Sequence, residues 1–236
     1  MKAVLLDLDD TLLDYSGGAE QCWAQACAAG ASALDQTLLL AELGTVRRWF
    51  WSDPERHRRE RIDMMRAWTT IVAHALERCG AADPGRAAAV AVDFATRRRA
   101  IMTLFPEAHD VLRALRARGL PLALVTNGDA REQRAKIERH ALAPFFDAIL
   151  IEGEMGVGKP EAVVYRRALD ALGVQAGPEV WMVGDHLEFD VAGSQRAGLR
   201  AAWIDRPGAG LPPGSAAQPD RILRTLDQLT RATVAP

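Results

Sequence analysis

Two aspartates, Asp7 and Asp9, lie two residues apart and directly follow an apolar run near the start of the chain. The run, residues 3–6, is continuous rather than alternating, which is typical of a strand buried on both faces of a sheet. Carboxylates are costly to bury together unless a cation or a proton offsets their repulsion. Because open α/β sheets bind ligands outside the carboxyl ends of their strands, the two aspartates are candidates for catalysis and for cation binding.

Polar residues also follow other apolar runs of the chain. Three further runs predict buried strands, at residues 122–125, 148–151 and 180–183. Thr126 and Asn127 follow the first of these runs. Lys159 lies in the loop after the second, and Asp185 and Asp190 follow the third. In a parallel sheet these side chains converge on one edge, where the acids suit Mg²⁺ and the lysine and hydroxyl suit a phosphate group.

The second half of the chain alternates between strand and helix patterns. Residues 201–204 predict the last strand, and the Pro/Gly-rich segment 206–219 predicts a loop. Pro160 fits the first turn of a helix that would run to Leu172, and another helix is expected at 191–197. Repeated β-α units predict an α/β fold, with a Rossmann-like parallel sheet, right-handed crossovers and helices on both faces.

The stretch between the first strand and the others, residues 15–103, has helical spacing of its apolar residues and no strand pattern. Asp53 and Asp83 are each followed by proline, a typical start of a helix. We therefore expect two domains. A Rossmann-like core would comprise 1–14 and 104–236, and an α-helical domain would be inserted above the carboxyl end of its sheet.

The composition excludes several classes of protein. The chain has 236 residues and a formal net charge of −2, which gives no general attraction to nucleic acids or acidic membranes. Its three cysteines form no C-x-x-C pair, so a disulfide framework or zinc site is not expected and a reducing cytoplasm fits best. No apolar run approaches the roughly 18 residues of a membrane helix, and no signal-peptide pattern precedes the first strand.

Four motifs, taken together with their order and spacing, resemble those of the haloacid dehalogenase (HAD) superfamily of hydrolases. The motifs are Asp7-Leu8-Asp9-Asp10-Thr11, Leu124-Val125-Thr126-Asn127-Gly128, Gly158-Lys159-Pro160 and Gly184-Asp185-His186-Leu187-Glu188-Phe189-Asp190. The resemblance covers nearly the full length of the chain. The helical stretch matches the position of the family's cap domain, between the first two motifs.

The resemblance implies a role for each residue of these motifs. Asp7 would be the nucleophile and would form an aspartyl-phosphate, and Asp9 would be the general acid and then the general base. Thr126, Asn127 and Lys159 would bind the transferring phosphoryl group. The implied activity is that of a phosphatase of a small phosphorylated metabolite, working as a monomer or homodimer.

The resemblance also implies a magnesium site. Asp185 would hold Mg²⁺ together with the carboxylate of Asp7 and the backbone carbonyl of Asp9. Asp190 would orient Lys159 or the water ligands of the metal. His186, which follows the metal ligand Asp185, is expected to be a plain loop residue, with contact to substrate or water as the alternative.

Other activities of the same fold remain alternatives. A 2-haloacid dehalogenase would use Asp7 without magnesium, but enzymes of that type typically lack an acid equivalent to Asp9. A phosphomutase and a catalytically silent binding module are further alternatives, although none of the motif residues is replaced. Residues 153–159 nearly match a nucleotide-binding P-loop, but Pro160 stands where that motif requires serine or threonine.

The helical stretch contains two groups of residues of special interest. Aromatic residues expected in its core are Trp49, Phe50, Trp51 and Trp68. Basic residues that would recognise an anionic substrate, under a second hypothesis, are Arg47, Arg48, His57 and Arg58. Hinges between the two domains are expected at residues 13–15 and 103–105.

Overall fold

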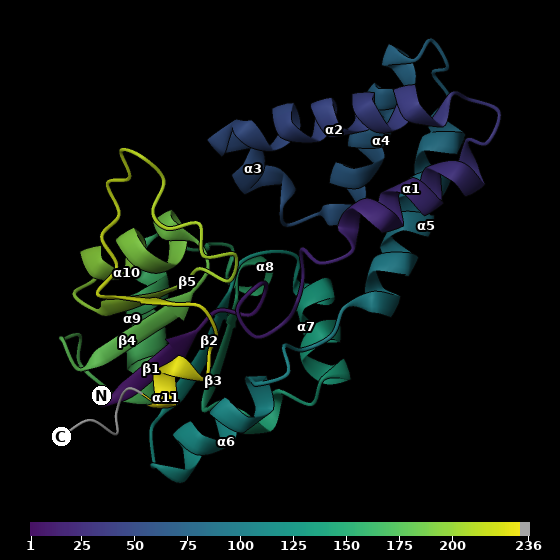
Figure 1. Ribbon diagram of the computed structural model, residues 1–236. Helices are drawn as coiled ribbons and strands as arrows, with labels where there is room; N and C mark the ends of the chain where they lie inside the picture. Colours follow the sequence, from purple (N-terminus) through teal and green to yellow (C-terminus); the bar gives the residue numbers. More distant parts are fainter. Residues whose placement is uncertain (232–236) are drawn as a thin grey trace. The chain divides into compact units, whose positions relative to one another are not determined.

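The computed structural model describes residues 1–231 (Figure 1). Contacts divide the chain into two compact units. One unit combines Met1–Tyr15 with the chain from Thr103 onward, and the other is Ser16–Met102. We refer to them as the sheet unit and the helical unit and describe each by itself.

The sheet unit is built on six parallel strands in the order β3-β2-β1-β4-β5-β6. The strands are β1 (Ala3–Leu6), β2 (Leu122–Thr126), β3 (Ala148–Ile151), β4 (Val180–Gly184), β5 (Arg200–Ile204) and β6 (Arg221–Leu223). Five of these strands were predicted from the sequence, and β6 was not. This edge strand has only three residues and leaves Ile222 49% exposed, so it has no continuous apolar run to reveal it.

The strand order places a topological switch point beside β1. The chain continues from β1 to β2 and β3 on one side, and β4, β5 and β6 lie on the other side. Ligands of such sheets bind in the crevice at the carboxyl ends where the order reverses. Leu6 pairs with Val183, and the backbone N–H of Asp7 donates to the Val183 carbonyl at 2.9 Å. This pairing brings the ends of β1 and β4 together.

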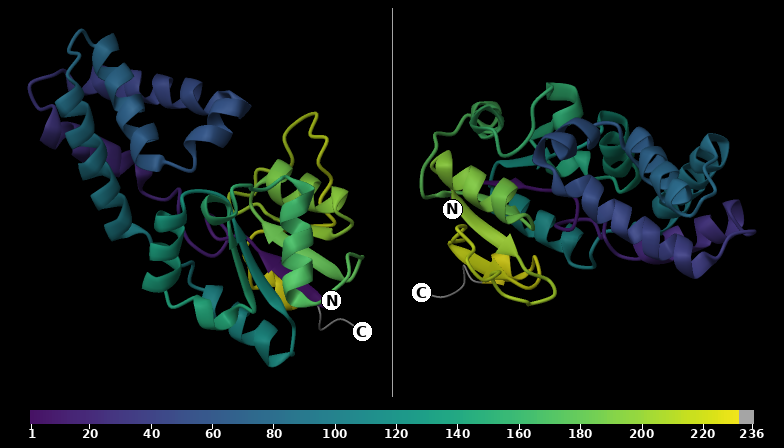
Figure 2. Two further views of the ribbon diagram at one scale, coloured as in Figure 1. Left: turned by 180° about the vertical axis from the view of Figure 1, so that it is seen from behind. Right: turned by 90° about the horizontal axis from the view of Figure 1, so that it is seen from above.

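Helices and turns flank the sheet on both faces (Figure 1, Figure 2). They are α6 (Ala108–Ala117), α7 (Ala130–Arg139), η1 (Ala143–Phe145), α8 (Glu152–Met155), α9 (Ala162–Leu172), η2 (Leu187–Ala192), α10 (Gly193–Arg196) and α11 (Gln228–Arg231). Helix α9 buries Val164, Tyr165, Ala168 and Leu169, which share one helix face and pack on apolar residues of the sheet. The predicted α/β fold is therefore confirmed.

Two helix boundaries differ from the sequence prediction. Helix α9 begins at Ala162 rather than at Pro160, because Glu161 has extended backbone and precedes the first turn. The helix predicted at 191–197 is present as α10 and begins earlier than expected, because the π-helical segment η2 precedes it and continues directly into it. Single-turn π-helical segments are often found at functional sites, and this one follows β4 at the switch point.

The two segments that connect the sheet unit to the rest of the chain run side by side. Leu13 and Leu104 form an isolated antiparallel bridge. Next to it, the backbone N–H of Asp14 donates to the Thr103 carbonyl at 2.9 Å. The segments predicted as hinges thus lie together in the sheet unit.

The helical unit consists of α1 (Ala19–Gly30), α2 (Gln36–Ser52), α3 (Pro54–Glu60), α4 (Met64–Arg78) and α5 (Pro84–Ile101). The two predicted helix starts are confirmed. The side chains of Asp53 and Asp83 cap α3 and α5 by accepting hydrogen bonds from backbone N–H groups at 2.7 and 2.9 Å. The unit has a hydrophobic core of its own, in which Trp23 stacks on Phe94 with ring centroids 3.5 Å apart.

One aromatic residue predicted in this core lies outside it. Phe50 and Trp68 are buried and Trp51 packs against the core, but Trp49 is 50% exposed. The buried residues of α2 follow helical spacing, and Trp49 lies to one side of their stripe, where the Arg56 guanidinium covers its ring at 4.2 Å. Within the described residues, no helix is long and apolar enough to cross a membrane.

Candidate active site

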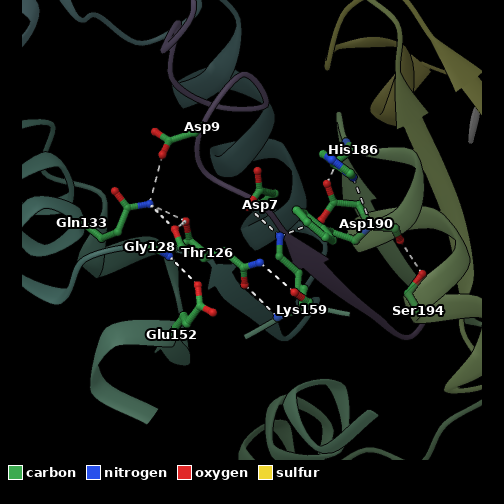
Figure 3. Close-up of polar contacts among 12 residues, drawn as sticks. Asp7, Asp9, Thr126, Gly128, Gln133, Glu152, Lys159, His186, Asp190 and Ser194 are labelled. Carbon is green, nitrogen blue, oxygen red and sulfur yellow. Dashed lines mark hydrogen bonds and ion pairs between the residues drawn. The ribbon is translucent and has the colours of Figure 1, made fainter. Parts of the chain in front are cut away.

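Lys159 lies at the centre of a buried ion-pair cluster at the carboxyl edge of the sheet (Figure 3). Its ammonium donates to Oδ1 of Asp7 and to Oδ1 of Asp190, both at 2.6 Å. All three side chains are buried, with residue exposures of 2%, 7% and 1% in that order. Burial alone lowers the pKa of the Lys159 ammonium, but Asp190 and Asp7 outweigh it and raise the pKa above its usual value. Lys159 is thus a fixed positive charge beside Asp7.

A third carboxylate, that of Asp185, joins the cluster from the end of β4. One carboxylate oxygen each from Asp7, Asp185 and Asp190 lies within 4.8 Å of the others. Burial raises the pKa of Asp185 to about 9, and repulsion from Asp7 and Asp190 adds to the effect. Burial also raises the pKa of Asp7 to about 7, although Lys159 opposes this shift. A single ammonium does not balance the three acids, so the cluster favours an additional cation.

The donor set of this cluster fits Mg²⁺, which prefers carboxylate oxygens and retains several waters. Asp190 is committed elsewhere, since its Oδ1 accepts from Lys159 and its Oδ2 accepts from the backbone N–H of His186 at 2.9 Å. Asp7 and Asp185 are therefore the carboxylates best placed to bind the cation. The side chain of Asp9 is not part of the cluster.

The turn that carries Asp190 is built by His186. The Nδ1 atom of His186 accepts hydrogen bonds from the backbone N–H groups of Glu188 and Phe189, both at 3.2 Å. Its ring stacks on that of Phe189 with centroids 3.8 Å apart. These contacts cap η2 and set the position from which Asp190 reaches Lys159. A plain loop residue was predicted here, and the capping role was not.

Asn127, in the loop after β2, holds the backbone of Lys159 by two hydrogen bonds. The side-chain amide of Asn127 donates to the Lys159 carbonyl at 2.8 Å, and its oxygen accepts from the Lys159 N–H at 2.7 Å. Glu152, which is buried, accepts from the backbone N–H of Gly128 at 2.9 Å. The side chain of Asn127 is thus used to position Lys159, and a phosphate contact from this residue would come from its backbone.

The carboxylate of Asp9 lies apart from the cluster around Lys159, on the side of helix α7 (Figure 3). The Lys136 ammonium donates to both of its oxygens, at 2.9 and 2.8 Å. Gln133 Nε2 lies 3.1 Å from Asp9 Oδ2 and 2.6 Å from the hydroxyl oxygen of Thr126. The structure therefore brings Asp7, Asp185, Asp190 and Lys159 into one group, with Asp9 and Thr126 beside it and linked by α7.

The sequence patterns did not indicate three further residues of the site, Gln133, Lys136 and Glu152. All three are polar residues that the structure buries. The available signal was weak, because Gln133 and Lys136 are three residues apart and share one face of a predicted helix directly after the second motif. Such spacing is also common on solvated helix faces.

Comparisons with a family model and with known sequences agree on one family. A model of haloacid dehalogenase-like hydrolases matches residues 1–198. A phosphoserine phosphatase of Thermus thermophilus is 37% identical, over 87% of this chain and 89% of its own length. A glyceraldehyde 3-phosphate phosphatase of Methanopyrus kandleri is 33% identical, over 87% of this chain and 84% of its own length.

Solved structures share the fold along nearly the whole chain. A HAD-hydrolase of Bacillus subtilis, YfnB, in a magnesium-bound form, matches with a TM-score of 0.77 at 21% identity and covers 99% of both chains. A 2-haloacid dehalogenase of Pseudomonas syringae matches with a TM-score of 0.66 at 28% identity, over 99% of this chain and 98% of its own. The chain belongs to the haloacid dehalogenase-like hydrolases.

Proposed function

We propose that this protein is a Mg²⁺-dependent phosphomonoester hydrolase that works through an aspartyl-phosphate on Asp7. The observation that carries the proposal is the buried carboxylate of Asp7, 2.6 Å from the Lys159 ammonium and grouped with Asp185. In this arrangement the Lys159 ammonium can bind phosphoryl oxygens, and Asp185 can share a metal ion with Asp7. The phosphatase activities named for the two relatives from Thermus thermophilus and Methanopyrus kandleri support the same reaction.

In the first step, a carboxylate oxygen of Asp7 attacks the phosphorus atom, and the bond between phosphorus and the ester oxygen breaks. We assign Asp9 as the acid that gives a proton to the departing oxygen, so that it leaves as an alcohol. The phosphoryl group is then bound covalently to Asp7. Division of the displacement into two steps lowers the barrier that each has to cross.

In the second step, water attacks the phosphorus atom of the aspartyl-phosphate. Asp9 takes a proton from this water, and the bond between phosphorus and the Asp7 oxygen breaks. Inorganic phosphate leaves, Asp7 regains its carboxylate, and Asp9 regains the proton that it donated. Lys159 faces the phosphoryl oxygens in both steps and stabilises their negative charge.

The remaining residues bind and position the reacting groups. We assign the Thr126 hydroxyl and the backbone of Asn127 to the phosphate, since the Asn127 side chain holds Lys159. Asp7, Asp185 and the backbone carbonyl of Asp9 would hold Mg²⁺, which supplies positive charge that offsets the repulsion between the nucleophile and the phosphate. Asp190 keeps Lys159 in place.

The proposed substrate is a small phosphorylated metabolite. These two relatives are named for phosphoserine and for glyceraldehyde 3-phosphate, which share a short carbon chain and a terminal phosphate ester. We assign the helical unit, Ser16–Met102, as the cap domain that determines substrate choice. The proposed setting is a reducing cytoplasm, in which the three cysteines remain the free thiols of the structure.

Phosphate release from a panel of esters tests this function. The purified protein with Mg²⁺ is expected to release phosphate from phosphoserine, glyceraldehyde 3-phosphate, a sugar phosphate or a nucleotide. The Asp7→Asn variant should fold and release none. Folded protein without activity on any ester would refute the phosphatase, and turnover by Asp7→Asn would place the nucleophile elsewhere.

The same preparation separates the phosphatase from the dehalogenase alternative. The structural likeness to the Pseudomonas syringae enzyme makes 2-chloropropionate a direct comparison substrate. Carbon attack by Asp7 would release chloride without added metal. We expect no chloride release, because the chain has Asp9, an acid that a departing halide does not need, and because Asp185 beside Asp7 suits a cation that carbon attack does not need.

A further inference from the structure

Two side chains of helix α7 hold the carboxylate of Asp9 by three contacts. Lys136 binds both carboxylate oxygens at 2.9 and 2.8 Å, and Gln133 binds Oδ2 at 3.1 Å. The residue exposures of Lys136 and Gln133 are 8% and 2%. Buried polar groups of this kind restrict a side chain to one orientation, because each lost contact leaves an unsatisfied group. The orientation of Asp9 is therefore determined by α7.

Gln133 connects Asp9 to the site proposed for the phosphate. Its Nε2 atom lies 2.6 Å from Thr126 Oγ1 and 3.0 Å from the Asn127 carbonyl, besides its contact with Asp9. The amide thus fixes the distance between Asp9 and the end of β2. A small displacement of Gln133 would move the acid–base group relative to the phosphoryl group, and catalysis is sensitive to such displacements.

Lys136 has its own support. Its ammonium lies 4.3 Å from the centroid of the Tyr15 ring, a distance typical of a cation–π contact. The Tyr15 backbone N–H donates to Asp10 Oδ1 at 3.0 Å, which holds the backbone of Tyr15 to the loop after β1. Lys136 therefore lies between a helix, an aromatic ring and the Asp9 carboxylate, and has little freedom to move.

We propose that Lys136 and Gln133 are positioning residues that orient the Asp9 carboxylate to take a proton from water when the aspartyl-phosphate is hydrolysed. The inference rests on the function proposed above. The three contacts that they make to Asp9 come from donors on one side of its carboxylate, so they hold it in one orientation for proton transfer with water. Loss of either residue should slow the second step more than the first.

An aryl phosphate separates the two steps. The p-nitrophenolate group leaves without a donated proton, so formation of the aspartyl-phosphate from p-nitrophenyl phosphate needs no help from Asp9. Its hydrolysis still needs Asp9 as a base. A rapid-mixing experiment therefore reports the first step as an initial burst of p-nitrophenolate and the second as the steady rate that follows.

For Lys136→Met we expect kcat to fall about tenfold or more, within the range that general base catalysis contributes. The burst rate constant should remain within about twofold of the native value, and the burst amplitude should approach one product per site. Acid quenching should then recover the phosphorylated protein. Gln133→Met should also lower the steady rate and leave the burst rate nearly unchanged. Lys136→Arg, which retains the donors, should have a higher steady rate than Lys136→Met.

Matched controls keep the outcomes distinct. Arg131 is exposed on the same helix, so Arg131→Met should leave burst and steady rate unchanged. An equal fall of the burst rate and the steady rate in Lys136→Met would overturn the inference, as would unchanged kinetics. If Lys136→Met does not fold, Lys136→Arg and Gln133→Met decide by the same readouts. Native protein that neither turns over nor accumulates phosphorylated protein would instead refute the proposed function.

Discussion

The Asn127 side chain contacts the backbone of Lys159 and not the ammonium of that lysine. The Asn127 side chain forms one donated and one accepted hydrogen bond with the Lys159 carbonyl and N–H groups, at 2.8 and 2.7 Å. The ammonium at the far end of the lysine is thereby left for Asp7 and Asp190. The loop after β2 and the loop after β3 are joined by this pair, so the Lys159 side chain extends from a backbone that is held in place.

The Asn127→Ala variant tests this support. Loss of both hydrogen bonds should let the backbone of Lys159 shift, and kcat for a phosphate ester should fall about 10- to 100-fold, as is typical when a residue that orients a catalytic group is removed. Gln195→Ala is the matched control, because the Gln195 amide donates to the Gln218 carbonyl away from the site. Equal activity of both variants and the native protein would show that Lys159 does not depend on Asn127.

Gly184 is packed against the carboxylate that holds Lys159. A Cβ atom at this position would lie 2.2 Å from both Cγ and Oδ2 of Asp190, which Lys159 and the His186 N–H hold in place. Gly184→Ala should therefore displace Asp190, lower kcat and cost about 1–3 kcal/mol of stability, the usual range for overpacking. Gly177→Ala is the control, since its Cβ meets nothing within 4 Å. Thermal unfolding and phosphate release measure both effects.

The residues at the strand ends could be predicted from sequence because their positions follow from local pattern. A buried parallel strand is a continuous apolar run, and the residue after the run lies at the carboxyl edge of the sheet. Asp7, Thr126 and Asp185 follow such runs, and the structure places each at that edge. The motif order then identified the family, which the comparisons confirm.

The supporting contacts could not be predicted, because they depend on how distant segments pack. Lys136 is 127 residues from Asp9 in sequence, and no local pattern distinguishes it from a solvated lysine. The exposure of Trp49 is a different case. The buried residues of α2 follow a helical period that includes Phe50 and excludes Trp49, so periodicity would have separated these neighbours.

The stacked pair of Trp23 and Phe94 should dominate the stability of the helical unit. Both residues are almost fully buried, and their centroids are 3.5 Å apart. Trp23→Ala should destabilise this unit by about 3–5 kcal/mol, the range for loss of a large buried aromatic side chain. Trp49→Ala, at an exposed position, should cost less than about 1 kcal/mol. Urea unfolding followed by circular dichroism would measure both, and equal losses would contradict the assignment of the core.

The acidic cluster should make the metal-free protein less stable as the pH rises. Burial, together with Asp7 and Asp190, raises the pKa of Asp185 from 3.8 to about 9, so folding favours its protonated form. The resulting stabilisation is complete below pH 3.8 and is lost progressively as the pH approaches about 9. Asp185→Asn removes this titration. Without metal, its melting temperature should exceed that of the native protein at pH 8, and the difference should shrink toward pH 5.

Added Mg²⁺ should reverse the order of these two proteins. A cation that binds only the folded state stabilises it by mass action, and the gain should be larger at pH 8 than at pH 5, where protons compete for the carboxylates. The native protein should therefore gain melting temperature with Mg²⁺, and Asp185→Asn should gain little because one of its carboxylate ligands is lost. Asp227→Asn, far along the chain and paired with Arg231, is a control for the loss of an acid. An equal response of native protein and Asp185→Asn to Mg²⁺ would place the metal site elsewhere.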